Sequence, residues 1–257
     1  AGSARRAALE LARQFTGASG FLLTTDADSR PCPNWVQANL LPLKDGTASL
    51  VCGAIELEPS EYNLLPQEVV GDGAVEGQFR RLALEIDNIL DPDPINIWPF
   101  HGAASGASLA VSASAYDLVG GMPAIPCGED RMLARRFFEH DLPIFYSDQA
   151  RVVTSCRLDG RAQGGMADTI AERVAGGEYV CDESVETAQM IWFRAECRSR
   201  LRAIFHSNGG VGDIQLELKR MGLSCQSLPQ FSKFGALWTY LEDACPALHR
   251  HRMTWPQ

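Results

Sequence analysis

The chain has 257 residues, of which 46% are hydrophobic and 21% charged, and its formal net charge at pH 7 is -9. This is the composition of a globular protein with one large domain, or with one domain and an appendage, and it excludes a disordered chain. The acidic balance argues against nonspecific binding to nucleic acid, no apolar run reaches the length of a transmembrane helix, and the first residues lack the apolar core of a signal peptide.

Hydrophobic periodicity predicts that helices alternate with strands in the first half of the chain. The predicted helices cover residues 3–15, 33–43 and 78–90, and the predicted strands cover residues 20–25 and 48–57. A loop rich in Glu, Pro and Gly is expected over residues 58–77. The alternation predicts an α/β fold with a mixed, mainly parallel sheet flanked by helices.

The second half of the chain continues the alternation and then becomes helical. Strands are predicted at residues 109–111, 143–146 and 151–156, and helices at residues 116–119, 131–138, 185–205, 214–221 and 231–241. The polar segment 157–165, which contains glycine, predicts a loop. We therefore expect an α/β core over residues 1–175 and a helical C-terminal extension over residues 176–257.

Two carboxylates, Asp26 and Asp28, follow the apolar run Phe21-Leu22-Leu23. In an extended chain, side chains two residues apart point the same way, so the two carboxylates could share one ion. Hard cations such as Mg²⁺ and Mn²⁺ take oxygen ligands of this kind and complete their shell with phosphate and water. An acidic loop after a strand explains the same residues, and the pattern alone leaves both interpretations open.

The eight cysteines are dispersed, and none forms a Cys-x-x-Cys pair. This spacing supports neither a zinc cluster nor a catalytic thiol. In a chain of this size without a secretory signal, free thiols are expected rather than disulfides. We therefore predict a cytoplasmic protein.

The order of several short motifs resembles that of family 2 nucleotide-sugar glycosyltransferases, which have the GT-A fold. Each motif is weak alone, but their order and separations together are specific, and they cover residues 2 to about 175, roughly two thirds of the chain. The motifs are Gly2-Ser3-Ala4-Arg5-Arg6, Thr25-Asp26-Ala27-Asp28-Ser29, Pro33-Asn34-Trp35, Val51-Cys52-Gly53, Gly106-Ala107-Ser108-Leu109-Ala110-Val111, Val119-Gly120-Gly121, Gly128-Glu129-Asp130 and the segment 157–165.

This resemblance implies a GT-A, Rossmann-like core that moves a sugar from a nucleotide-diphosphate donor to a hydroxyl acceptor. Asp26 and Asp28 match the metal motif and would hold Mg²⁺ or Mn²⁺ against the donor diphosphate, with Asp28 favoured as the direct ligand. Asp130 matches the general base of inverting members, and Glu129 stands beside it. A first helical turn rich in carboxylates also explains Glu129 and Asp130 without any catalytic role.

The resemblance assigns further positions to the two substrates. Toward the donor these are Arg5, Arg157, Arg161 and Gln163, and toward the acceptor they are Trp98, His101 and Ser108. Several of these have a plain alternative: a solvated helix residue for Arg5, a solvated loop for residues 157–163, and burial in the core for Trp98.

Two features depart from the family. Thr154-Ser155 stands where many relatives place a metal-binding His, and residues 1–257 offer no counterpart to the first strand-helix-strand portion with its Pro-x-x-Asn-Glu motif. If a partner segment or a second copy of the chain supplies the missing strands, this chain holds the catalytic half of the enzyme.

Two alternative functions stay open at this point. One is a catalytically incomplete binding or scaffolding protein derived from a glycosyltransferase, with an exposed sheet edge. The other is a retaining GT-A enzyme, in which Asp26 and Asp28 keep their role and that of Asp130 changes.

Overall fold

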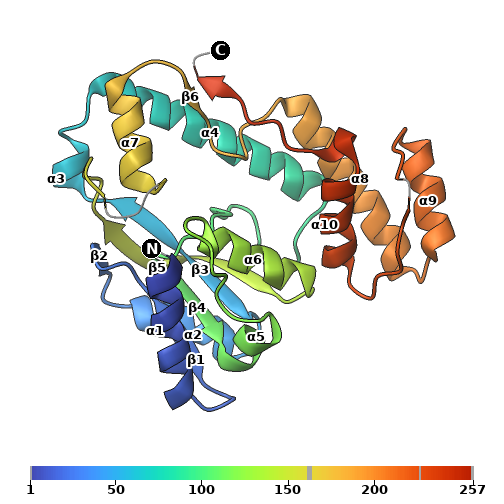
Figure 1. The fold of residues 1–257 in the computed structure, drawn as a ribbon, viewed down its shortest axis with the longest axis horizontal. Helices are drawn as coiled ribbons and strands as arrows, with labels where there is room; N and C mark the ends of the chain where they lie inside the picture. Colours follow the sequence, from blue (N-terminus) through green and yellow to red (C-terminus); the bar gives the residue numbers. More distant parts are fainter. Residues whose placement is uncertain (1, 161–163, 226, 256–257) are drawn as a thin grey trace. The chain divides into compact units, whose positions relative to one another are not determined.

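The computed structural model describes residues 2–160, 164–225 and 227–255, and the chain divides into two compact units (Figure 1). The first unit comprises residues 1–73, 95–138 and 142–177, and the second comprises residues 74–94, 139–141 and 178–257. Two segments of the second unit, 74–94 and 139–141, thus fall within the range that the sequence assigned to the core.

A five-stranded sheet, in the order β1-β4-β3-β5-β2, forms the centre of the first unit. The strands are β1 (Phe21–Thr24), β2 (Ser29–Pro31), β3 (Leu50–Leu57), β4 (Leu109–Ser112) and β5 (Ile144–Thr154). Only β3 and β5 pair in parallel among these strands, and the other three pairs are antiparallel. The predicted α/β class and mixed sheet are confirmed, but the expectation of a mainly parallel sheet was wrong, because β4 and β2 run opposite to the other three strands.

Helices flank this sheet on both faces, and the alternation of side chains along the strands divides the core accordingly. The helices that contribute to its core are α1 (Gly2–Phe15), α2 (Trp35–Lys44), α5 (Ala113–Leu118) and α6 (Glu129–Glu139). The same part of the chain also forms α3 (Pro59–Tyr62), α7 (Met166–Ala175) and α4 (Gln67–Leu90), most of which belongs to the second unit. Leu50 and Cys52 of β3 belong to a core cluster with residues of α1, α5 and α6. Val51 belongs to a second cluster with Trp35 and Leu43 of α2.

The sequence did not predict β2, α3, α7 or the two short strands of the C-terminal segment, and two further elements differ from the prediction. Helix α4 begins at Gln67, inside the segment predicted as a loop, because tertiary context overrides the weak helix propensity of its glycines. The two strands predicted at residues 143–146 and 151–156 form one strand, β5. The register shifts here, since Gly53 of β3 pairs with Ser147 and Ile55 with Val152, so residues 148–151 of β5 form an irregularity inside one continuous strand.

The second unit confirms the predicted helices of the C-terminal segment. It contains α8 (Ala188–His206), α9 (Val211–Arg220), α10 (Phe234–Ala244), the short 3-10 helix η1 (Pro246–Leu248) and a two-stranded ribbon of β6 (Tyr179–Val180) and β7 (Thr254–Trp255). Asp91 accepts hydrogen bonds from Arg198 at 2.6 Å and from Arg202 at 2.9 Å, which ties residue 91 to α8. Across the described ranges, no helix has both the length and the apolar character needed to cross a membrane.

The sheet topology brings several chain segments to one edge. Strands β1, β3 and β5 point the same way, so their carboxyl ends lie together. The register pairs Thr24 at the end of β1 with Leu109 at the start of β4, so the turn before β4 reaches the same edge.

Buried hydrogen bonds fix this turn against the sheet. The indole N–H of Trp35 donates to Ser108 Oγ at 2.8 Å, and the Ser108 hydroxyl donates to the Ala150 carbonyl at 2.8 Å. Gly53 leaves room for this contact, because a Cβ there would come within 2.1 Å of Ser108 Oγ. These bonds therefore hold the turn before β4 in place at the carboxyl edge of the sheet.

Candidate functional site

The turn that carries Asp26 and Asp28 crosses the carboxyl edge of the sheet. It joins β1 to β2, which lie at opposite ends of the strand order of the curled sheet. The two carboxylates make ion pairs with different partners, Asp26 with Arg5 and Asp28 with Arg157. They are partly exposed, with side-chain exposures of 38% and 35%.

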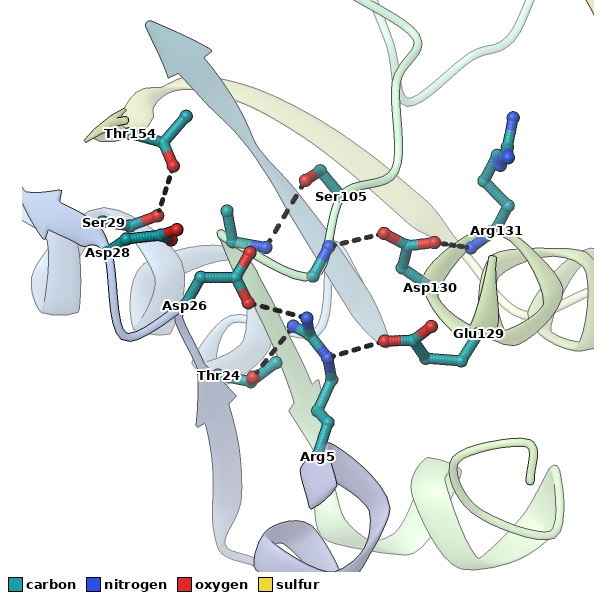
Figure 2. Close-up of polar contacts among 12 residues, drawn as sticks. Arg5, Thr24, Asp26, Asp28, Ser29, Ser105, Glu129, Asp130, Arg131 and Thr154 are labelled. Atoms are coloured by element: carbon teal, nitrogen blue, oxygen red, sulfur yellow. Dashed lines mark hydrogen bonds and ion pairs between the residues drawn. The ribbon is translucent and has the colours of Figure 1, made fainter. Parts of the chain in front are cut away.

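Arg5 of α1 is the centre of the polar network in Figure 2. Its Nη2 lies 2.7 Å from Asp26 Oδ1, and its Nε lies 3.1 Å from Glu129 Oε1. Its Nη1 also donates to Thr24 Oγ1 at 3.3 Å. The Arg5 and Glu129 side chains are only 11% and 5% exposed, so each charge depends on the other for compensation. One guanidinium thus connects α1, β1, the Asp26 turn and α6.

Gly106 lies between Arg5 and Asp130, and contacts both through its backbone. A Cβ at Gly106 would come within 1.9 Å of Arg5 Nη1, so only glycine lets the guanidinium pass to Asp26. The Gly106 N–H donates to Asp130 Oδ2 at 2.8 Å, and the Arg131 N–H donates to Asp130 Oδ1 at 2.8 Å. The sequence placed Gly106 in a motif and in a run, residues 102–108, expected to face the acceptor, but it predicted neither its proximity to Arg5 nor its bond to Asp130.

Asp28 lines a pocket of about 300 Å³ beside this network. The pocket is formed by Ala27, Asp28, Ser29, Arg30, Glu58, Glu61, Val153 and Ser155. The side chain of Arg157 reaches Asp28, with Nη2 at 2.8 Å from Oδ2. Glu58 pairs with Arg30 at 2.9 Å. Sequence reasoning missed Glu58 and Glu61, because both fell in or beside a segment predicted as a loop and matched no motif.

Glu61 holds the start of the segment that leads to Arg157. Its Oε2 accepts hydrogen bonds from the Ser155 hydroxyl and from the Cys156 N–H, both at 2.7 Å. These two bonds, with a smaller contribution from the charge of Arg157, hold the pKa of Glu61 below its ordinary value.

The pocket supplies oxygen donors of the kind that Mg²⁺ and Mn²⁺ prefer. Among the residues that the structure describes, no group of three or more His, Cys, Asp or Glu side chains is arranged to hold a metal ion. Asp28 faces the pocket, whereas Asp26 is held by Arg5. The donor set therefore fits a divalent cation only when phosphate and water complete the ligand shell.

Two residues predicted to face the acceptor, Trp98 and His101, belong to an aromatic group with Phe100 and Tyr146. His101 Nδ1 accepts from the Ala103 N–H at 3.2 Å, and its Nε2 lies 3.2 Å from the Cys52 carbonyl oxygen. Trp98 packs edge-on against Phe100, which stacks on Tyr146 with ring centroids 5.5 Å apart. Both Trp98 and Phe100 are half-buried.

The structure thus brings Arg5, Asp26 and Glu129 into one network, with Asp130 bonded to Gly106 next to it and with Asp28 paired with Arg157. Ser108 is fully buried, and its hydroxyl is bonded inside the core. Arg161 and Gln163 lie outside the described residues. Compared with models of known families and with curated proteins, the sequence matches none.

Replacing Gly106 by Ala should displace Arg5 from Asp26, because the added methyl group would occupy the position of the guanidinium. We expect Gly106→Ala to lower the free energy of unfolding by about 1–3 kcal/mol, as overpacking does. Gly71→Ala is the matched control, since a Cβ there has open space on α4 and should gain up to about 1 kcal/mol. Equal stability of wild type and Gly106→Ala in urea unfolding would contradict the described position of Arg5.

The lowered pKa of Glu61 predicts a pH-dependent contribution to stability. A carboxylate whose pKa is lower in the folded state stabilises the fold above its ordinary pKa of about 4.3, and this contribution is lost as the pH falls through the lowered value. Glu61→Gln should therefore be less stable than wild type at pH 7, and the difference should shrink as the solution is acidified. Urea unfolding from pH 7 to pH 3 measures this difference, with the exposed Glu172→Gln as control. A difference that stays constant with pH would contradict the role of the charge.

Proposed function

We propose that this protein is a glycosyltransferase of the GT-A fold, which moves a sugar from a nucleotide-diphosphate donor to a hydroxyl acceptor with inversion at the anomeric carbon. The observation that carries the proposal is the network around Arg5. At the carboxyl edge of an α/β sheet, the guanidinium of Arg5 joins the carboxylate of Asp26 to that of Glu129, which follows Arg5 by 124 positions in the sequence. Crevices at this edge are where α/β proteins commonly bind their ligands.

The donor diphosphate is proposed to bind at the pocket of Asp28. Mg²⁺ or Mn²⁺, bound by Asp28 together with phosphate and water, would stabilise the negative charge of the leaving nucleoside diphosphate. The guanidinium of Arg157, already beside Asp28, suits phosphate oxygens because its planar fork can donate two parallel hydrogen bonds. Arg161 and Gln163 are proposed to act on the same diphosphate.

Asp130 is proposed as the general base that accepts the proton of the acceptor hydroxyl as it attacks the anomeric carbon. The backbone N–H groups of Gly106 and Arg131 fix the orientation of its two oxygens. Glu129 is buried and engaged by Arg5, which suits a positioning residue that holds the start of α6. Trp98 and His101 are proposed to line the acceptor side, where the half-buried indole offers an apolar face to a sugar.

A second candidate function rests on strand β1. Its residues Phe21-Leu22-Leu23 are apolar toward both faces, as in a central strand, yet in the described sheet β1 stands at the end of the strand order. Such an edge is a template for pairing with another strand. This favours association with a partner segment or a second copy of the chain, which would serve either a complete enzyme or a scaffolding protein without activity.

Binding and transfer separate these functions when measured on defined variants. Calorimetry with a panel of nucleoside diphosphates and Mn²⁺ should show binding by the wild type and loss of metal-dependent binding in Asp28→Ala. Asp130→Asn should keep that binding and lose transfer, because its amide cannot accept the proton. The exposed Asp148→Asn on β5 serves as control and should retain both.

Two outcomes of the same experiment decide against parts of the proposal. If the intact wild-type protein binds none of the nucleoside diphosphates, the enzymatic function fails and the scaffolding function gains support. If transfer occurs with retention of the anomeric configuration, as read by NMR of the product, the role of Asp130 as base for direct displacement is wrong.

A further inference from the structure

Each carboxylate of the Asp-x-Asp motif forms an ion pair with an arginine, Asp26 with Arg5 and Asp28 with Arg157. The two arginines differ in their exposure and in the number of their other contacts. Arg5 is 11% exposed and contacts Thr24, Asp26 and Glu129. The Arg157 side chain is 43% exposed and contacts Asp28, with one further bond from Nε to the Asp159 carbonyl at 2.7 Å. Exposed ion pairs contribute little to stability, so the guanidinium of Arg157 can leave Asp28 at small cost, whereas Arg5 cannot leave its partners.

The backbone before Arg157 is fixed next to Asp28 independently of this ion pair. The Ser155 N–H donates to the Asp28 carbonyl at 3.3 Å, and Glu61 binds both the Ser155 hydroxyl and the Cys156 N–H. The side chain of Arg157 can therefore change partner while its Cα stays at the rim of the pocket.

A divalent cation and a guanidinium compete for the same oxygens of Asp28. A cation that arrives alone must displace Arg157, and the two positive charges then repel each other at short range. The other carboxylates of the pocket already have partners, since Glu58 is paired with Arg30 and Glu61 accepts hydrogen bonds from Ser155 and Cys156, so they compensate the charge of a displaced Arg157 less well than Asp28 does. A diphosphate that arrives with the cation supplies oxygens for the displaced guanidinium.

We infer that the guanidinium of Arg157 is an exchangeable counter-ion, which occupies the site of a divalent cation on Asp28 in the free protein. A divalent cation and a diphosphate then bind together rather than one after the other. The inference rests on the proposed function for the identity of the diphosphate as part of a nucleotide sugar. It goes further in giving Arg157 two alternative partners, Asp28 in the free protein and phosphate oxygens in the complex. Because coupling between two ligands is reciprocal, the diphosphate must strengthen cation binding by the same factor as the cation strengthens diphosphate binding.

The test measures binding of Mn²⁺ alone by electron paramagnetic resonance, in the wild type and in Arg157→Gln. We expect the variant to bind Mn²⁺ about fivefold or more tightly, because the competing cation is gone. Inorganic pyrophosphate should strengthen Mn²⁺ binding in the wild type, and this strengthening should be largely lost in the variant. Circular dichroism checks that the exposed substitution leaves the fold intact.

Arg151→Gln is the control, because it removes one exposed positive charge that pairs with Glu56 and does not line the pocket of Asp28. It should raise the affinity for Mn²⁺ less and leave the effect of pyrophosphate unchanged. Unchanged affinity for Mn²⁺ in Arg157→Gln would overturn the inference. The same holds if both substitutions change the strengthening of Mn²⁺ binding by pyrophosphate equally.

A nucleoside diphosphate in place of pyrophosphate separates the inference from the proposed function. Coupling of Mn²⁺ to pyrophosphate but to no nucleoside diphosphate would support the exchange at Asp28 and contradict the glycosyltransferase. Binding of Mn²⁺ with a nucleoside diphosphate, without any effect of Arg157→Gln, would support the glycosyltransferase and contradict the exchange.

Discussion

The ion pair between Arg5 and the buried carboxylate of Glu129 is the interaction on which the candidate site depends. Glu129 is 5% exposed, and loss of one partner of such a buried pair typically costs about 3–5 kcal/mol. The pair also requires two glycines, since a Cβ at Gly106 would meet the Arg5 guanidinium and a Cβ at Gly2 would meet the Ile125 carbonyl oxygen at 2.3 Å. Helix α1 can thus approach α6 and the turn before β4 closely because Gly2 and Gly106 have no side chain, as well as because the charges attract.

This fixed pair gives the two aspartates of the motif different chemical roles. Asp26 completes the Arg5 network and shares its rigidity, whereas Asp28 faces a pocket and has an exposed partner. A rigid first half and an adaptable second half suit a site that must hold its geometry while a charged ligand enters. The proposed base Asp130 belongs to the rigid half, because its oxygens are held by the backbone of Gly106 and Arg131.

The local sequence pattern predicted the strands and helices that carry the site. The contacts between them and the directions of the strands depend on long-range packing, which the pattern does not show. The apolar run before Asp26, the helical spacing after Glu129 and the motif around Gly106 are each readable in the sequence. The contacts of Arg5 are not, because its three partners lie 19 to 124 residues away. Strand direction was also misjudged: alternation of helices and strands favours parallel pairing, but only the folded topology shows that β4 and β2 run the other way. Glu61 was missed because its role depends on Ser155, 94 residues later.

The most direct test of the account is a crystal structure of the intact protein grown with Mn²⁺ and a nucleoside diphosphate, with the cation located by its anomalous scattering. The account predicts Mn²⁺ bound to the carboxylate of Asp28 and to diphosphate oxygens, Arg157 turned from Asp28 to the phosphate, and Arg5 still paired with Asp26 and Glu129. Mn²⁺ or diphosphate bound away from Asp28, or an unchanged pair of Asp28 and Arg157 beside bound ligand, would contradict it.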